Sequence, residues 1–196
     1  MRLKDRGVLL CGDSGAGKSS LAFACALKGW TYLSDDSSRL VRGFQDRLVV
    51  GNPYQIRFRE TATDLFPELR DQRLTTRATG ELAIELPTAR LPHIRTTTQC
   101  SVDYVIFLNR RQAGPAHLSR FSKDTALQWF EQSIACWEKE TVEAHKASLR
   151  RLLTAEILEL RYADLASAVE QLETLVRDGL HSHSRLCVAE EGLNNA

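Results

Sequence analysis

Eight residues near the start of the chain, Gly-Asp-Ser-Gly-Ala-Gly-Lys-Ser at positions 12–19, match the pattern G-x-x-x-x-G-K-[ST] of loops that bind nucleotide phosphates. Glycines in such a loop let several backbone N–H groups converge on phosphate oxygens, and the start of the following helix adds a partial positive charge. Lys18 would contact the β- and γ-phosphates, and the hydroxyl of Ser19 would bind Mg²⁺. We therefore expect ATP and Mg²⁺ to bind at Gly12, Asp13, Ser14, Gly15, Ala16, Gly17, Lys18, Ser19 and Ser20.

Two adjacent carboxylates, Asp35 and Asp36, follow a stretch rich in strand formers at residues 30–34. A strand, a loop, a helix and a second strand in this order form a parallel pair, and ligands bind at the carboxyl ends of such strands. We expect both aspartates to lie at the sheet edge that also holds the loop. An acidic pair at a strand end is often only a solvated surface feature, and the preceding loop is what favours a functional role here.

The residues flanking the loop predict the strand and the helix that it needs. Residues 7–11 form a short apolar run typical of a buried strand, and residues 20–28 have helix-forming composition. Gly29 stands where a left-handed helix cap is expected. The loop is therefore predicted to join a buried strand to a helix.

The rest of the chain mixes strands with helices. A hairpin is predicted at residues 39–43 and 47–51, and single strands are predicted at 54–59, 81–86, 102–108 and 157–162. A helical turn is expected at 64–67 and longer helices at 122–137, 142–153 and 164–179, the last with its apolar positions on one face, and with Ser122 and Asp164 as N-caps. We expect an α/β fold, with a mixed β-sheet and flanking helices, in one domain over residues 1–180, followed by a flexible C-terminal tail over 181–196.

Composition excludes several classes of protein. Charged residues make up 26% of the chain and the formal net charge is +1, so no strongly basic nucleic-acid surface is expected. The sequence contains no apolar run of membrane-spanning length and no signal peptide before the first strand, which favours a cytoplasmic protein with no membrane partner. Five scattered cysteines without C-x-x-C spacing are expected to be buried thiols.

Two sequence motifs typical of GTPases are missing from the chain, which narrows the class of phosphate-binding protein. No Asp-x-x-Gly and no Asn-Lys-x-Asp sequence occurs, which argues against a GTPase. The loop at 12–19, the following helix with Lys28 and Gly29, and then Asp35 and Asp36 resemble the C-terminal catalytic domain of HPr kinase/phosphorylase. Stretches such as 30–36, 65–69 and 160–165 are more similar to an uncharacterised, HPr-kinase-related branch.

The resemblance implies a fold shared with phosphoenolpyruvate carboxykinase and an ATP-dependent serine kinase. Asp35 would accept the proton of a seryl hydroxyl, Asp36 would hold Mg²⁺ together with Ser19, and Lys18 would neutralise the transferring phosphoryl group. The acceptor would be a hydroxyl-bearing protein, peptide or small metabolite, and the family's oligomers suggest a possible homo-oligomer.

The chain departs from this family in three places. No histidine precedes the loop, Gln55 stands where the family signature is acidic, and its basic C-terminal signature has no equivalent, although Glu60 could compensate for Gln55. These departures argue against the phosphorylase reaction. They leave open a nucleotide-responsive regulatory module that transfers phosphate weakly, and an incomplete gene product.

Other candidate residues have simpler interpretations. Arg57, Arg59 and Arg77 could bind phosphate but are more simply surface arginines. His181, His183 and Cys187 are metal-ligand types, yet they stand in the predicted tail without a fourth ligand. The aromatic residues of the 122–137 helix are expected to serve the core or a subunit interface and not to stack on a nucleobase, namely Trp129, Phe130 and Trp137.

Overall fold

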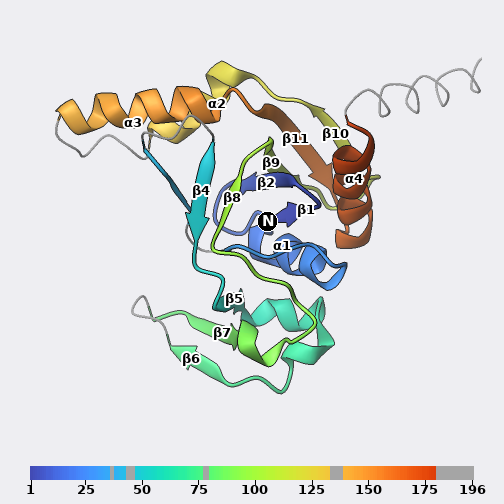
Figure 1. Cartoon of the computed structure of the whole chain (residues 1–196). Coiled ribbons are helices and arrows are strands. Elements are labelled where there is room, and N and C mark those ends of the chain that lie inside the picture. The colour runs from blue at the N-terminus through green and yellow to red at the C-terminus, as the bar shows by residue number, and fades with distance from the viewer. Residues whose placement is uncertain (36–37, 43–46, 77–79, 133–138, 180–196) are drawn as a thin grey trace, which may run out of the picture.

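The computed structural model describes residues 1–35, 38–42, 47–76, 80–132 and 139–179 (Figure 1). Its centre is a five-stranded sheet in the order β1-β2-β9-β11-β10. Three parallel strands form the middle, and an antiparallel strand pairs with each outer side. In chain order these strands are β1 (Arg2–Leu3), β2 (Arg6–Cys11), β9 (Tyr104–Arg110), β10 (His117–Arg120) and β11 (Glu156–Tyr162).

Strand β9 holds the central position because its side chains are buried on both faces. Ile106 and Leu108 belong to one hydrophobic cluster, whereas Val105 and Phe107 belong to the other. In the register with β2, Cys11 lies opposite Phe107, so both strands end near the same edge. This confirms the strands predicted at residues 7–11 and 102–108.

One helix pair covers each face of the sheet (Figure 1). Helices α1 (Lys18–Leu27) and α4 (Leu165–Asp178) pack against one face, and α2 (Lys123–Glu131) and α3 (Lys139–Leu152) pack against the other. The predicted caps are confirmed, because the side chains of Ser122 and Asp164 accept hydrogen bonds from the N–H groups of the first turns they precede. Gly29 has φ +89°, as a left-handed cap requires.

The second strand that we expected at residues 30–34 does not form. Thr31 and Tyr32 make only isolated bridges, to Arg2 and Thr96, and the parallel neighbour of β2 is β9. The strand-like composition of this stretch reflects burial instead, since the side chains of Trp30 and Tyr32 are inaccessible to solvent. The predicted topology around β2 was therefore wrong, although the helix after the loop was right.

Two small antiparallel sheets complete the fold. One joins β3 (Ser38–Leu40), β4 (Leu48–Gly51) and β8 (Gln99–Ser101), which confirms the predicted hairpin. The other has the order β5-β7-β6, with β5 (Gln55–Arg59), β6 (Leu74–Thr76) and β7 (Leu82–Pro87), and lies beyond α1 in Figure 1. The turn expected at 64–67 differs, because one 3-10 turn spans Glu60–Asp64 and Pro67 begins another at Pro67–Leu69.

Aromatic packing joins the β5-β7-β6 sheet to the core. Phe23 of α1 meets Phe58 of β5 and Phe66 edge-on, with ring centroids 5.1 and 4.9 Å apart. Because α1 follows directly on the loop of residues 12–17, this packing also fixes β5 beside that loop.

The buried thiols were predicted correctly where the structure describes them. Cys11, Cys25 and Cys100 are free and buried, and burial raises the pKa of the Cys11 thiol to about 12. Cys136 and the expected tail, residues 181–196, lie outside the described residues. None of the helices in the described ranges is long and apolar enough to cross a membrane.

Candidate functional site

The β2–α1 loop, residues 12–17, has a backbone that only glycine adopts easily at three positions. Gly12, Gly15 and Gly17 have φ values of +147°, +88° and +92°. The N–H of Ala16 donates to the carbonyl of Asp13 over 3.1 Å and closes a turn within the loop. The glycines of the motif are therefore required by the curl of the chain.

Tyr162, at the end of β11, supports this loop from beneath. Its hydroxyl donates to the carbonyl of Ala16 over 2.8 Å, and a Cβ atom on Gly17 would come within 2.3 Å of the same oxygen. Burial raises the pKa of Tyr162, so the phenol keeps its proton as a donor. The close approach of Tyr162 explains why no side chain fits at position 17.

The loop and the start of α1 present a group of unused N–H donors. With the described residues, the backbone N–H groups of residues 14, 15 and 17–20 form no hydrogen bond. Gly17, the N-cap of α1, has no side chain to satisfy them. Converging N–H groups at a helix start, with the helix dipole behind them, are suited to bind an anion.

Lys18 bends back over the first half of the loop. Its Nζ atom donates to the carbonyl of Gly12 over 2.7 Å and to the carbonyl of Asp13 over 2.8 Å. An ammonium group has three N–H donors, so one remains for a ligand. The ammonium therefore lies beside the N–H donors of the loop and adds a full positive charge to them.

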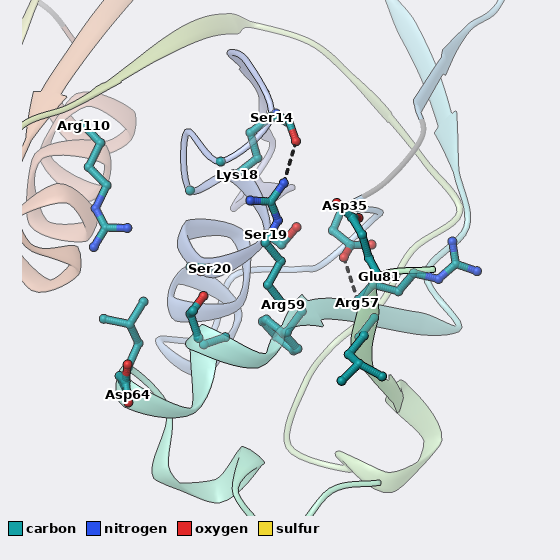
Figure 2. Close-up of a pocket in the computed structure, with 18 residues that line it drawn as sticks. Ser14, Lys18, Ser19, Ser20, Asp35, Arg57, Arg59, Asp64, Glu81 and Arg110 are labelled. Carbon is teal, nitrogen blue, oxygen red and sulfur yellow. Dashed lines mark hydrogen bonds between the residues drawn. The ribbon is translucent and has the colours of Figure 1, made fainter. Parts of the chain in front are cut away.

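A cleft of about 510 Å³ opens in front of the loop and has the size of small-molecule sites (Figure 2). One wall is the loop with the first turn of α1, and the other is formed by the end of β5 and the 3-10 turn that follows. The charged side chains in the lining are the cations Lys18, Arg57, Arg59 and Arg110 and the carboxylates Asp35, Asp64 and Glu81.

Asp35 lies in this cleft with its carboxylate fixed on both oxygens. Oδ1 accepts a hydrogen bond from the Tyr32 hydroxyl at 2.9 Å. Oδ2 accepts one from the backbone N–H of Arg57 at 2.8 Å, which Figure 2 shows. Asp35 thus reaches the side of the loop that we expected, although segment 30–34 is not a strand of the central sheet. Asp36 lies outside the described residues.

Two of the three candidate arginines are described, and they differ. The guanidinium of Arg59 crosses to the loop and donates to Oγ of Ser14 over 2.9 Å (Figure 2). Arg57 instead pairs with Glu85 at 3.1 Å and directs its guanidinium away from the loop in the same view. Arg59 is therefore the arginine placed to meet an anion at the loop, whereas Arg77 lies outside the described residues.

Three charged residues of the cleft were not predicted, namely Arg110, Asp64 and Glu81. Arg110 ends β9, and Figure 2 shows it on the opposite side of the loop from Asp35. Its guanidinium forms no hydrogen bond or ion pair with a described residue. The rule that ligands bind at the carboxyl ends of parallel strands could have identified it.

A smaller cavity of about 220 Å³ lies behind the first half of the loop. Lys18 and Asp35 are the only residues that line both this cavity and the larger cleft among the lining residues that the structure describes. The ammonium and the carboxylate therefore stand at the place where the two spaces meet.

Oxygen ligands suited to Mg²⁺ are present at the loop. The hydroxyl of Ser19 and the carboxylate of Asp35 both line the larger cleft, and Mg²⁺ commonly binds through one or two protein oxygens together with substrate phosphates. The described residues hold no cluster of three or more His, Cys, Asp or Glu side chains that could bind a metal alone. A magnesium ion that arrives with a nucleotide fits this donor set better than a resident metal.

Of the comparisons with known proteins, the one with solved structures found similar chains. No protein-family profile and no curated protein matches the chain. Among solved structures, it is similar to the HPr(Ser) kinase/phosphatase from Coxiella burnetii, with a TM-score of 0.46 and 12% identity, over 99% of this chain and 94% of that one. A similarity of this degree does not establish a shared family or activity.

Proposed function

We propose that this chain is an ATP-dependent kinase that transfers the γ-phosphoryl group to a serine-type hydroxyl. The observation that supports this most is the shared position of Lys18 and Asp35, an ammonium and a fixed carboxylate between two cavities beside a loop of unused N–H donors. A phosphoryl transfer needs those parts: charge neutralisation, in-line placement of donor and acceptor, and a carboxylate beside the nucleophile.

The triphosphate is assigned to the larger cleft. The N–H groups of residues 14, 15 and 17–20 would bind its oxygens, with Lys18 and Arg59 adding charge. Ser19 and Asp36 would hold Mg²⁺, and the bound ion would neutralise phosphate charge.

The proposed reaction assigns the role of proton acceptor to Asp35. The hydroxyl oxygen of the acceptor attacks the γ-phosphorus, the bond from that phosphorus to the bridging β–γ oxygen breaks, and ADP leaves. Asp35 takes the proton of the attacking hydroxyl. The hydrogen bonds from Tyr32 and from the N–H of Arg57 keep its carboxylate in place during the transfer.

The test is a comparison of Asp35→Asn with wild type and with Asp64→Asn, a carboxylate on another wall of the same cleft. We expect Asp35→Asn to lose at least about a hundredfold in phosphoryl transfer from γ-labelled ATP, as removal of a general base does, while binding ATP as tightly as wild type. Asp64→Asn should keep turnover. Equal turnover in all three chains would contradict the proposal.

A regulatory module is the second candidate, favoured by Gln55 at a position where the resembling family is acidic. Such a module would bind ATP through the same loop without efficient transfer. Mass spectrometry of lysate proteins after incubation with the chain and γ-labelled ATP separates the two, because only the kinase leaves labelled acceptors that disappear with Asp35→Asn.

A further inference from the structure

The smaller cavity differs from the larger cleft in its lining. Its volume of about 220 Å³ is below the range of sites that hold whole small-molecule ligands and suits a side chain with its adjoining backbone. Apart from Lys18, Asp35 and two serines, its wall is apolar or glycine. The residues whose N–H donors favour phosphates, 14, 15 and 17–20, all line the larger cleft, so we assign the nucleotide to that cleft.

Two aromatic side chains of α2 form one wall of this cavity. Trp129 and Phe130 are partly buried and lie edge-on to each other, with ring centroids 5.1 Å apart. Both also contact Phe107 of β9, at 5.4 and 6.1 Å, which fixes them to the sheet. Their remaining accessible surface therefore offers a fixed apolar contact close to Asp35.

The backbone of β2 offers hydrogen-bonding groups at the same cavity. Val8 exchanges hydrogen bonds with Met1, at 2.8 and 3.1 Å, so its N–H and C=O point to the outer edge of β2. Because strand residues alternate, Leu10 directs its own N–H and C=O to that edge, and Leu10 lines the cavity. In the part of the chain that the structure describes, these two groups of Leu10 have no hydrogen-bond partner.

We propose that the smaller cavity is the acceptor site and that it takes an extended peptide whose serine has an apolar or aromatic neighbour. The peptide backbone would pair with Leu10, the apolar neighbour would contact Trp129 and Phe130, and the serine hydroxyl would lie beside Asp35. This rests on the proposed kinase function, since in-line transfer requires the acceptor to approach the γ-phosphorus from the side opposite ADP. The two cavities that meet at Lys18 and Asp35 provide those two sides.

The probe is a set of acetylated tripeptide amides with a central serine and Phe, Leu, Gly, Asp or Lys on either side, with alanine in place of serine as the blank. Transfer from γ-labelled ATP is measured together with ATP hydrolysis and the KM for ATP. The matched variants are Phe130→Leu and Phe121→Leu: Phe121 stacks on the same Phe107 with centroids 4.4 Å apart but does not line the cavity. Trp129→Phe replaces Phe130→Leu if the latter does not fold.

We expect wild type to phosphorylate the Phe and Leu peptides with kcat/KM about tenfold or more above the Gly and Asp peptides. Phe130→Leu should reduce that preference several-fold without changing the KM for ATP, and Phe121→Leu should keep it. The inference is overturned if ATP is hydrolysed but no peptide is phosphorylated, if neighbours make no difference, or if the two variants behave alike. A raised KM for ATP in Phe130→Leu would instead assign the cavity to the nucleotide, and absence of all ATP turnover would overturn the kinase function itself.

Discussion

The hydroxyl of Tyr162 donates a 2.8 Å hydrogen bond to the carbonyl of Ala16, joining the end of β11 to a loop 146 positions earlier in the chain. The N–H groups of residues 17–20, which follow this carbonyl, are among those assigned to phosphate. A bond that fixes Ala16 therefore orients the peptides of Gly17 and Lys18. We regard Tyr162 as a residue that positions the loop.

Tyr162→Phe removes the hydroxyl group and with it the hydrogen bond to the Ala16 carbonyl. Loss of one such bond costs about 1 kcal/mol, so the Kd for ATP should rise by about fivefold. Isothermal titration of ATP measures this, with Tyr104→Phe, at the other end of the sheet, as the control. Unchanged affinity in Tyr162→Phe would show that the loop needs no support from β11.

Gly17→Ala tests the close approach itself. The new Cβ would lie 2.3 Å from the Tyr162 hydroxyl, at a φ of +92° that disfavours side chains. We expect loss of ATP binding and a lower melting temperature. Gly114→Ala is the control, because Gly114 also has a positive φ, +109°, but a Cβ atom there would meet nothing within 4 Å, so the change should cost only the backbone strain of about 1–2 kcal/mol. Equal effects of the two changes would argue against the contact with Tyr162.

Arg59→Gln tests whether the arginine at the loop contacts phosphate. Its guanidinium donates a hydrogen bond to Ser14, and we expect it to bind phosphate oxygens instead when ATP binds. The Kd for ATP should rise about tenfold, as for the loss of a charged hydrogen bond, and more for ATP than for AMP. Arg161→Gln, an exposed arginine paired with Glu159, is the control and should bind both nucleotides normally. The same loss for ATP and AMP would place Arg59 away from the β- and γ-phosphates.

The pH dependence of stability tests the cap of α4. The side chain and the N–H of Ser167 hydrogen-bond the Asp164 carboxylate and lower its pKa, so the folded state favours the ionised form. Its contribution is present above the unfolded-state pKa and is lost as the pH falls through the lowered folded-state pKa.

Asp164→Ala should therefore destabilise the fold by about 1 kcal/mol at pH 7, with a difference that shrinks in acid. Denaturant unfolding across pH 2.5–7 measures this. Asp164→Asn, which can still cap but does not ionise, should lose less at pH 7. A loss for Asp164→Ala that is the same at every pH would contradict a role for the charge.

Local signals predicted the unit that contains the loop. The apolar run before Gly12, the helix formers after Ser19 and the cap at Gly29 depend on neighbouring residues, so β2 and α1 could be predicted from the sequence. The partner of β2 could not be predicted, because β9 takes that place through burial on both of its faces, and the paired residues of β9 are 96 positions further along the chain. Residues 30–34 are also rich in strand formers, but this composition reflects the burial of Trp30 and Tyr32 and not a strand of the central sheet.

The parts of the site that the sequence could not predict are long-range contacts. Tyr162 reaches the loop from β11, and nothing in its local sequence marks it. Arg59 was one of three candidate arginines, and its contact with the loop from β5 is what distinguishes it from Arg57. Asp35 was predicted from its place after the loop, and it reaches the cleft through the hydrogen bonds from Tyr32 and the N–H of Arg57. Its role as a proton acceptor stays a prediction.

The most direct test is a crystal structure of the chain with Mg²⁺ and a non-hydrolysable ATP analogue. We predict that the phosphates bind the N–H groups of residues 14, 15 and 17–20, with the γ-phosphorus between Lys18 and the carboxylate of Asp35. A triphosphate bound elsewhere, or a γ-phosphorus remote from Asp35, would contradict the proposed reaction.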